Sequence, residues 1–260
     1  MRSENQSWLL RKSPSLRFSL KSILFVVLGN CIWLGWVTDS ALQESRAVET
    51  LVSQGVKIDF TADYPMSIRR PFPKWFRSCL PSSFQQMANK AFSYGNCIEN
   101  LAPLGKLRGL QILVLEGKAC NDISALEGLP LSKVYFHDTA IVDLRPIRGC
   151  STLYVLDIVD TPVTDISPLA TCPNIFGICL LGTEVTDISC LRNTSTLELV
   201  HIQDSPVKDL TLLKNLPNLS RATFSPSADY GQIAILKDSL PNCDIRVTTK
   251  QKYRRADRSN

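Results

Sequence analysis

The chain has 260 residues, of which 44% are hydrophobic and 20% are charged, and its net charge is +5. This composition is ordinary for a globular protein, and the length suffices for one good-sized domain with appendages. The positive charge lies at the ends: residues 1–22 hold five basic and one acidic residue, and residues 246–260 hold six basic and one acidic residue. Residues 23–245 therefore carry −4, which argues against a nucleic-acid-binding face in the folded part.

An uncharged apolar run covers residues 23–37 and follows the basic N-terminal segment. Together with Phe18–Leu20 and the aliphatic stem of Lys21, the run reaches about the 20 residues that a helix needs to cross a bilayer. We therefore expect a transmembrane signal anchor over residues 23–37.

The residues around this run predict its orientation. Trp33 and Trp36 stand near its far end, as in the aromatic belt of a membrane interface. The excess of basic residues before the run places residues 1–22 in the cytoplasm and exports the remainder. The alternative is a cleaved signal peptide, but Val37–Ala41 offers no clear small-x-small cleavage site, so an uncleaved anchor is favoured.

Residues 38–83 are predicted to form a juxtamembrane helix, a strand and an N-terminal cap. Residues 40–54 carry an apolar stripe at helical spacing that ends at Gly55, and Val56–Phe60 alternates like a short strand. Residues 62–83 are rich in proline, with basic and aromatic side chains among them. A capping segment is the favoured interpretation, and a membrane-surface patch is the alternative.

Two patterns then repeat with one period. A run of the form Leu-x-x-Leu-x-Leu, as in Leu153–Ile158, recurs every 21 or 22 residues. An acidic position recurs with the same period, at Asp122, Asp143, Asp165, Asp187 and Asp209. Asn100 takes this position one repeat earlier. Each unit predicts a short strand, a turn and a short helical return, and stacking of the units buries their apolar sides in one core.

The turn of each unit carries its own signature. A polar position, occupied by Thr139, Thr161 and Thr183, is predicted to hydrogen-bond backbone groups that the turn leaves unpaired, and Lys118 departs from this pattern. The segment Asp165–Pro168 predicts capping of the return helix, with Ser167 as N-cap and Pro168 at the first helical position.

These units resemble leucine-rich repeat proteins of the short bacterial, internalin-like type over residues 84–226. The resemblance implies an α/β solenoid, a horseshoe whose short parallel strands form a concave face that usually binds partners. The layout is also similar to bacterial proteins that present an exported repeat domain from an N-terminal transmembrane helix. Residues 227–246 are expected to form a C-terminal cap, and residues 247–260 a basic disordered tail.

The strand alternation defines the side chains of the concave face. We expect partner binding by Tyr135, His137, Val155, Asp157, Val159, Cys179, Leu181, Leu199, His201, Gln203 and Arg221. An apolar patch, expected to be exposed, is typical of an interface and consists of Val114, Val155, Val159, Leu181 and Leu199.

Three side chains on this face are candidates for catalysis or metal binding. Asp157, Cys179 and His201 are predicted to be neighbours, and a cysteine beside a histidine is the minimum for a thiolate nucleophile. The acid, however, flanks Cys179 instead of orienting His201, and it would raise the pKa of the thiol. A metal site built from the same three residues is also disfavoured, because a flat ladder gives little convergence. The sequence contains no glycine-rich phosphate loop, no His-Glu-x-x-His and no Cys-x-x-Cys pair, so no cofactor or metal is expected.

Nine cysteines do not form a general disulfide framework. Cys31 and Cys120 are expected to be small core residues. The pairs Cys150/Cys172 and Cys79/Cys97 are candidate disulfides in an oxidising compartment.

The sequence therefore predicts an exported, membrane-anchored module that binds an unidentified protein or envelope ligand without catalysis. The alternatives are a passive spacer of the cell envelope and, more remotely, an enzyme that uses Cys179 and His201.

Overall fold

The computed structural model describes residues 20–61, 87–95 and 100–248. The chain divides into two compact units, Met1–Gln43 and Glu44–Asn260. Helix α1 (Leu20–Ser53) is continuous where the sequence predicted an anchor over 23–37 and a separate helix over 40–54. Within the described part of the chain, the helices fall short of the length and apolarity that crossing a membrane requires.

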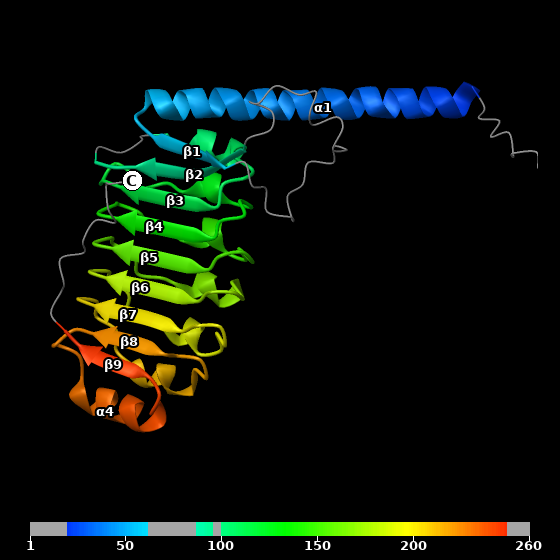
Figure 1. Ribbon diagram of the computed structural model, residues 1–260. Helices are drawn as coiled ribbons and strands as arrows, with labels where there is room; N and C mark the ends of the chain where they lie inside the picture. The colour runs from blue at the N-terminus through cyan, green and yellow to red at the C-terminus, as the bar shows by residue number, and fades with distance from the viewer. Residues whose placement is uncertain (1–19, 62–86, 96–99, 249–260) are drawn as a thin grey trace, which may run out of the picture. The chain divides into compact units, whose positions relative to one another are not determined.

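A sheet of nine strands dominates the second unit, with the strands in chain order (Figure 1). Strands β1 and β2 pair antiparallel, and all later neighbours pair parallel and in register. The strands are β1 (Lys57–Thr61), β2 (Met87–Ser93), β3 (Ile112–Glu116), β4 (Lys133–His137), β5 (Val155–Val159), β6 (Gly177–Leu181), β7 (Leu199–Gln203), β8 (Arg221–Phe224) and β9 (Asp244–Val247).

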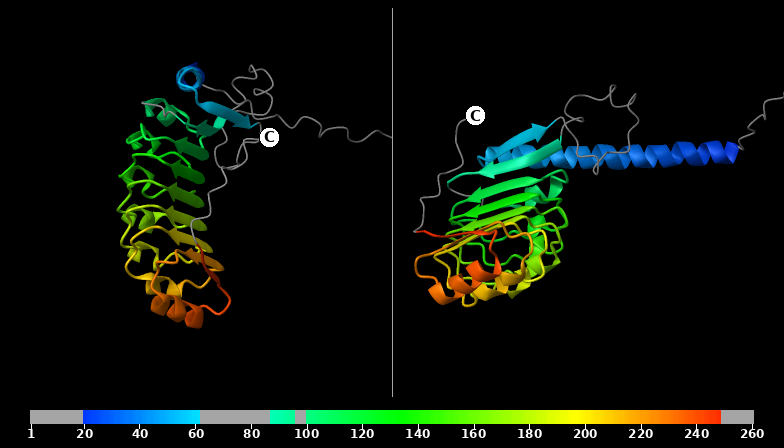
Figure 2. Two further views of the ribbon diagram at one scale, coloured as in Figure 1. Left: turned by 90° about the vertical axis from the view of Figure 1, so that its left-hand side faces the viewer. Right: turned by 60° about the horizontal axis from the view of Figure 1, so that its bottom comes forward.

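The segments that lead from the end of one strand back to the start of the next lie on the side of the solenoid opposite the sheet (Figure 2). These return segments are 3-10 turns instead of α-helices. Returns of three to six residues are too short for α-helical propagation, whereas 3-10 turns suit such short pieces. They are η2 (Ala102–Lys106), η3 (Ser124–Leu126), η4 (Arg145–Ile147), η5 (Ser167–Thr171), η6 (Ser189–Leu191) and η7 (Leu210–Asn215). Helix α4 (Tyr230–Ser239) and strand β9 follow the last repeat.

The repeated acidic position, which is asparagine in the first repeat, precedes each 3-10 turn. In every repeat its side-chain oxygen accepts a hydrogen bond from the backbone N–H two residues ahead, for example 2.7 Å from Ser167 to Asp165 and 2.9 Å from Ala102 to Asn100. Ser167 is not the N-cap that the sequence suggested, because its hydroxyl donates to Asp165 at 3.0 Å. The capping role belongs to the acid, two residues before the turn begins.

These caps make stability depend on pH. The hydrogen bonds from Ser189 hold the pKa of Asp187 below its ordinary 3.8, so the cap stabilises the fold above that value. This stability is lost as the pH falls through the lowered pKa of the folded state. Replacement of Asp187 by asparagine keeps an acceptor but removes the titration. We expect the acid-unfolding curve of Asp187→Asn to be flatter below pH 4 than that of the parent, measured by circular dichroism; an unchanged slope would contradict this role.

Backbone hydrogen bonds tie each repeat to the next in the same way. The carbonyl oxygen that precedes a strand accepts two N–H groups from the following repeat. Ser132 O accepts from Tyr154 N at 2.8 Å and from Val155 N at 3.0 Å, and Tyr154 O accepts from Phe176 N at 2.9 Å. Because the same bonds recur at each boundary, the strands stay in register from β3 to β8.

The polar position of the turns behaves as the sequence predicted. The Thr161 hydroxyl donates to Val159 O at 2.9 Å and lies 3.5 Å from the Thr139 hydroxyl. The Thr183 and Ser205 hydroxyls are 2.9 Å apart. Lys118 departs from the ladder, and its ammonium group lies 3.6 Å from the Asp138 carboxylate at the surface.

The structure corrects two predictions about the cysteines. Cys150 and Cys172 are free thiols, so the predicted bridge between them is wrong. Their Sγ atoms point to backbone oxygens instead, at 3.3 Å from Leu131 O and 3.5 Å from Ile147 O. Cys120 is buried as expected, but it is disulfide-bonded and not a free core thiol. The predictions for the Cys31 side chain, for Cys79/Cys97 and for residues 62–83 lie outside the part that the structure describes.

Candidate functional site

The strand register places the predicted face residues in columns. Asp157 pairs with Cys179, and Cys179 pairs with His201 in the next strand. His137, Val159, Leu181 and Gln203 form the neighbouring column at the strand ends. The columns derived from the sequence are therefore those of the folded chain. The partner-binding role of these residues stays a prediction.

The exposure of this face differs from the expectation. Val159 and Leu181 were expected to be exposed, but they are only 6% and 3% exposed. Asp157 is 5% exposed, whereas Val114, Val155 and Leu199 are half-buried. Alternation along a strand gives the side to which a residue points, but it does not show how deeply neighbouring rows cover it. The apolar surface available to a partner is thus centred on the half-buried valines and Leu199.

A polar cluster interrupts the apolar surface between β4 and β5. The His137 Nε2 atom lies 3.7 Å from the Asp157 carboxylate, and the Tyr135 and His137 rings meet edge to face at 6.2 Å. Burial and the nearby Asp157 charge both raise the pKa of Tyr135, so the phenol stays protonated and can donate a hydrogen bond. The cluster combines an aromatic ring, a donor and a buried acid at one spot.

The environment of Cys179 opposes nucleophilic chemistry. Burial raises the pKa of the Cys179 thiol, and the charge of Asp157 raises it further. Burial lowers the pKa of His201, which outweighs the opposite effect of Asp157. A neutral imidazole beside a protonated thiol is the reverse of a thiolate–imidazolium pair. Among the described residues, no group of three His, Cys, Asp or Glu side chains is arranged to hold a metal ion.

This environment predicts slow thiol chemistry at position 179. At pH 7 we expect Cys179 to alkylate at least about tenfold more slowly than free cysteine, because the reaction needs the thiolate. Peptide mass spectrometry after a timed iodoacetamide pulse resolves each cysteine separately. The isosteric Asp157→Asn variant should react faster than the parent. Alkylation of Cys179 at or above the rate of free cysteine would reopen the enzyme alternative.

The C-terminal end of the face is fixed by charged and amide groups. Asp244 lies 3.7 Å from the Arg221 guanidinium and 2.7 Å from that of Arg246. Gln203 reaches across from β7, and its Nε2 atom donates to the backbone oxygen and the hydroxyl of Thr248, at 2.9 Å each. Arg221 thus presents an exposed positive charge beside Asp244, and Gln203 holds Thr248 at the end of β9.

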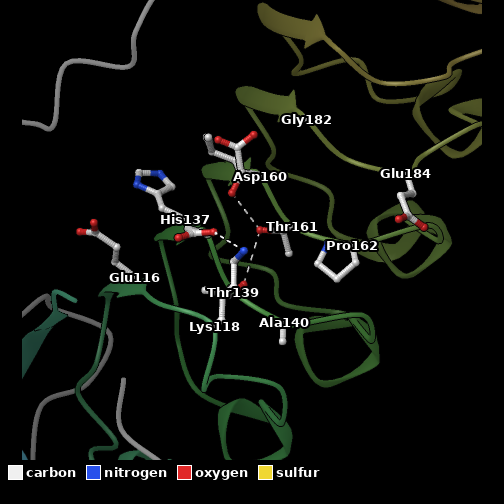
Figure 3. Close-up of a pocket in the computed structure, with 12 residues that line it drawn as sticks. Glu116, Lys118, His137, Thr139, Ala140, Asp160, Thr161, Pro162, Gly182 and Glu184 are labelled. Carbon is white, nitrogen blue, oxygen red and sulfur yellow. Dashed lines mark hydrogen bonds and ion pairs between the residues drawn. The ribbon is translucent and has the colours of Figure 1, made fainter. Parts of the chain in front are cut away.

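A groove of about 800 Å³ opens where strands β3 to β6 end, and we call it the strand-end groove. Acidic side chains line it, together with Lys118 and His137; they are Glu116, Asp138, Asp160 and Glu184. The Thr139 and Thr161 hydroxyls meet at its floor, with Glu116, His137 and Asp160 on one side and Glu184 on the other (Figure 3). Its ionised side chains sum to −3 when histidine is neutral, from four acids and one lysine.

The sequence reasoning missed this groove, although a signal was present. The position directly after each of the strands β3 to β7 has a positive φ, with Asp138, Asp160 and Asp204 at 50°, 50° and 51°. Glycine takes the same position at Gly117 and Gly182. A column that accepts only aspartate or glycine marks a left-handed turn, because these residues tolerate that conformation. The column also sets a row of carboxylates along one edge of the sheet.

The repeated strand, capped turn and 3-10 return define a leucine-rich repeat solenoid. No protein-family model matches the chain, and no curated protein matches it either. Among solved structures, internalin C2 from Listeria monocytogenes is 27% identical, with a TM-score of 0.47 over 51% of this chain and 59% of that chain. Internalin F from the same organism is 19% identical, with a TM-score of 0.44 over 60% of this chain and 59% of that chain.

A plant peptide hormone receptor, RGFR1, solved in complex with RGF2, is 10% identical, with a TM-score of 0.33 over 63% of this chain and 34% of that chain. The chain thus matches over less than two thirds of the length of these proteins.

Proposed function

We propose that this chain is a binding module that holds a protein or envelope ligand against the concave face of strands β3 to β8. The observation that carries the proposal is the cluster of Tyr135, His137 and Asp157 set within half-buried apolar side chains. Aromatic and charged groups in partly desolvated positions are the usual anchors of protein interfaces.

The face is suited to binding and poorly suited to catalysis. Its strands form a rigid array, so little conformational entropy is lost when a partner settles on it. Val155 and Leu199 offer apolar surface, and Arg221 offers an exposed positive charge beside Asp244. The raised thiol pKa of Cys179 leaves the most reactive side chain of the face protonated at neutral pH.

The experiment compares two photo-crosslinking positions in the native cell. One chain carries the photoreactive residue in place of Tyr135, and the other carries it at the exposed Ala170 on the side of the 3-10 turns. We expect one adduct specific to position 135, which mass spectrometry can name. A second substitution, Leu199→Arg, should abolish that adduct, whereas Ala170→Arg should leave it unchanged.

The same experiment tests the passive-spacer alternative. A spacer has no preferred face, so adducts at positions 135 and 170 would be equal or absent. The charge reversal Arg221→Glu would then change nothing either. Asp157 is unsuitable for charge reversal because it is 5% exposed, and a lysine there would be buried beside His137.

Export of the repeat domain is part of the same proposal. A disulfide at Cys120 is typical of an oxidising compartment, which agrees with the charge pattern around residues 1–37. The membrane anchor itself rests on the apolar run of residues 23–37 in the sequence. Carbonate extraction of membranes tests the anchor, and protease added outside the cytoplasmic membrane tests the orientation. Release of the intact chain by carbonate would refute the anchor without affecting the binding proposal.

A further inference from the structure

We infer that strand β9 is a dimerisation edge, at which two copies of this chain pair antiparallel and join their sheets into one. The inference goes beyond ligand binding by the concave face and does not depend on it, because Tyr135 lies several strands away in β4. It rests on the open edge of β9, on the half-buried apolar side chains at that end of the core, and on the charges that β9 carries.

Strand β9 ends the sheet (Figure 1). It pairs with β8 in unbroken register, and none of the described strands pairs with its other side. Asp244 N and Thr248 N donate toward β8, at 2.8 and 3.0 Å from the carbonyl oxygens that accept them. Because backbone groups alternate between the two sides of a strand, those of Ile245 and Val247 point to the open side. An edge of this kind is a template for pairing with another strand.

The apolar core is incompletely covered at the same end. The side chains of Leu240, Cys243, Ile245 and Val247 pack against the core but are only half-buried. Helix α4, which lies on the side of the 3-10 turns (Figure 2), carries a further apolar side chain, Ile235, that is 46% exposed. The last unit of a solenoid ordinarily shields the core with a polar outer surface. Here that surface is partly apolar, which is typical of an interface.

The opposite end of the sheet lacks these properties. Strand β1 shifts register between Asp59 and Phe60, and an irregularity of this kind protects an edge from pairing. Before β1, Leu51 and Val56 are 0% and 3% exposed, so the core is covered there. Of the two ends, β9 is therefore the one suited to a partner strand.

The charges on β9 favour a second copy of the same strand. Asp244 and Arg246 point to the concave face, because they pair with Arg221 and Thr223 of β8. In an antiparallel pair with the two Ile245 residues opposite each other, Asp244 of each copy faces Arg246 of the other. These are the close pairs, in which cross-strand side chains interact most directly. Centring the pair on Asp244 or on Arg246 instead would set like charges against each other, so the charges select one register.

The same register matches the backbone groups. The Ile245 N–H of each copy meets the Ile245 oxygen of the other, and the Val247 N–H meets the Cys243 oxygen. The Cys243 N–H takes no part, because it already donates to Leu240 O at 3.0 Å. On the inner face, Ile245 packs on its counterpart and Val247 packs on Cys243, so apolar side chains cover one another. Because both copies use the same patch, the assembly closes as a twofold dimer.

Cysteine crosslinking on the purified full chain tests this register. In a Cys243→Ser background, Ile245→Cys sets two thiols in a hydrogen-bonded pair whose Cα atoms are about 5.5 Å apart, a distance that a disulfide spans. We expect a covalent dimer on a non-reducing gel after mild oxidation. In the same background, Val142→Cys, at a side chain that is 54% exposed and far from β9, should give at most about a tenth of that yield.

A charge exchange tests the choice of partner. Asp244→Arg and Arg246→Asp each set like charges against each other when two identical copies pair. We expect each variant alone to crosslink about tenfold less through Ile245→Cys than the parent does. A mixture of the two variants restores opposite charges at both close pairs, so it should crosslink as well as the parent. This recovery also shows that both variants are folded.

Sedimentation of the chain without added cysteines measures the assembly in solution. We expect a monomer–dimer equilibrium that Asp244→Arg shifts toward the monomer. Absence of a covalent dimer, equal yields at positions 245 and 142, or a dimer that the charge variants leave unchanged would overturn the inference. Species larger than a dimer would also overturn it, in favour of pairing between β9 and β1 of the next copy. None of these results bears on photo-crosslinking at Tyr135.

Discussion

Replacement of Leu156 by alanine is expected to lower the free energy of unfolding by about 2–5 kcal/mol, the usual range for a fully buried leucine. Leu156 is 0% exposed and stands in β5, in the middle of the sheet. Its row neighbours Val134 and Ile178 are also buried, so the cavity has packed side chains on two sides. A repeat array is stabilised through contacts between neighbours, and a weak central repeat therefore weakens both halves.

Urea unfolding followed by circular dichroism measures the loss, and amide exchange maps it. We expect protection to fall most in β4, β5 and β6 and least in α4. Val142→Ala, at a side chain that is 54% exposed, is the matched control and should change stability by less than about 0.5 kcal/mol. Equal effects of the two substitutions would show that the rows do not form one continuous core.

The second large effect is expected at Gly182. Its φ of +63° lies in the left-handed region, where an alanine costs about 1–2 kcal/mol. An added Cβ atom would also collide with the Asp160 carboxylate of the preceding repeat. Gly182→Ala is therefore expected to destabilise the fold by more than the backbone cost alone, measured by urea unfolding.

A double-mutant cycle separates the two causes. In an Asp160→Gly background the collision disappears, and only the backbone cost of Gly182→Ala remains. The coupling between the two sites should be about 1 kcal/mol or more. As a control, Gly149→Ala also places a side chain at positive φ, but no atom lies within 4 Å of the added Cβ. Purely additive changes at positions 160 and 182 would mean that the carboxylate moves aside without cost.

The repeat period was sufficient to predict the register of the sheet. A row of leucines and a row of aspartates with one spacing leave a single way to stack, so Asp157, Cys179 and His201 are neighbours in the fold as in the prediction. The sequence also predicted a cap at the start of each return, but it assigned the cap to Ser167, whereas the side chain that accepts the backbone N–H is that of Asp165. Each such conclusion depends on residues within one repeat or on identical positions in adjacent repeats.

The wrong predictions concern features that depend on packing between repeats and not only on the repeat period. Stacked positions suggested a bridge between Cys150 and Cys172, but the thiols face backbone oxygens of the preceding repeats. Strand alternation suggested that Val159 and Leu181 are exposed, yet packing across rows buries them. The strand-end groove combines side chains from several turns, and nothing within one repeat marks a cavity.

The paired hydrogen bonds that Ser132, Tyr154 and Phe176 accept make every internal boundary of the solenoid interchangeable. A duplication or deletion of one whole repeat would thus create a junction with the same pair of backbone hydrogen bonds as the existing ones. Such a change lengthens or shortens the sheet by one row, about 4.8 Å, and leaves both caps as they are. The length of the proposed binding face can therefore be varied in discrete steps of one repeat.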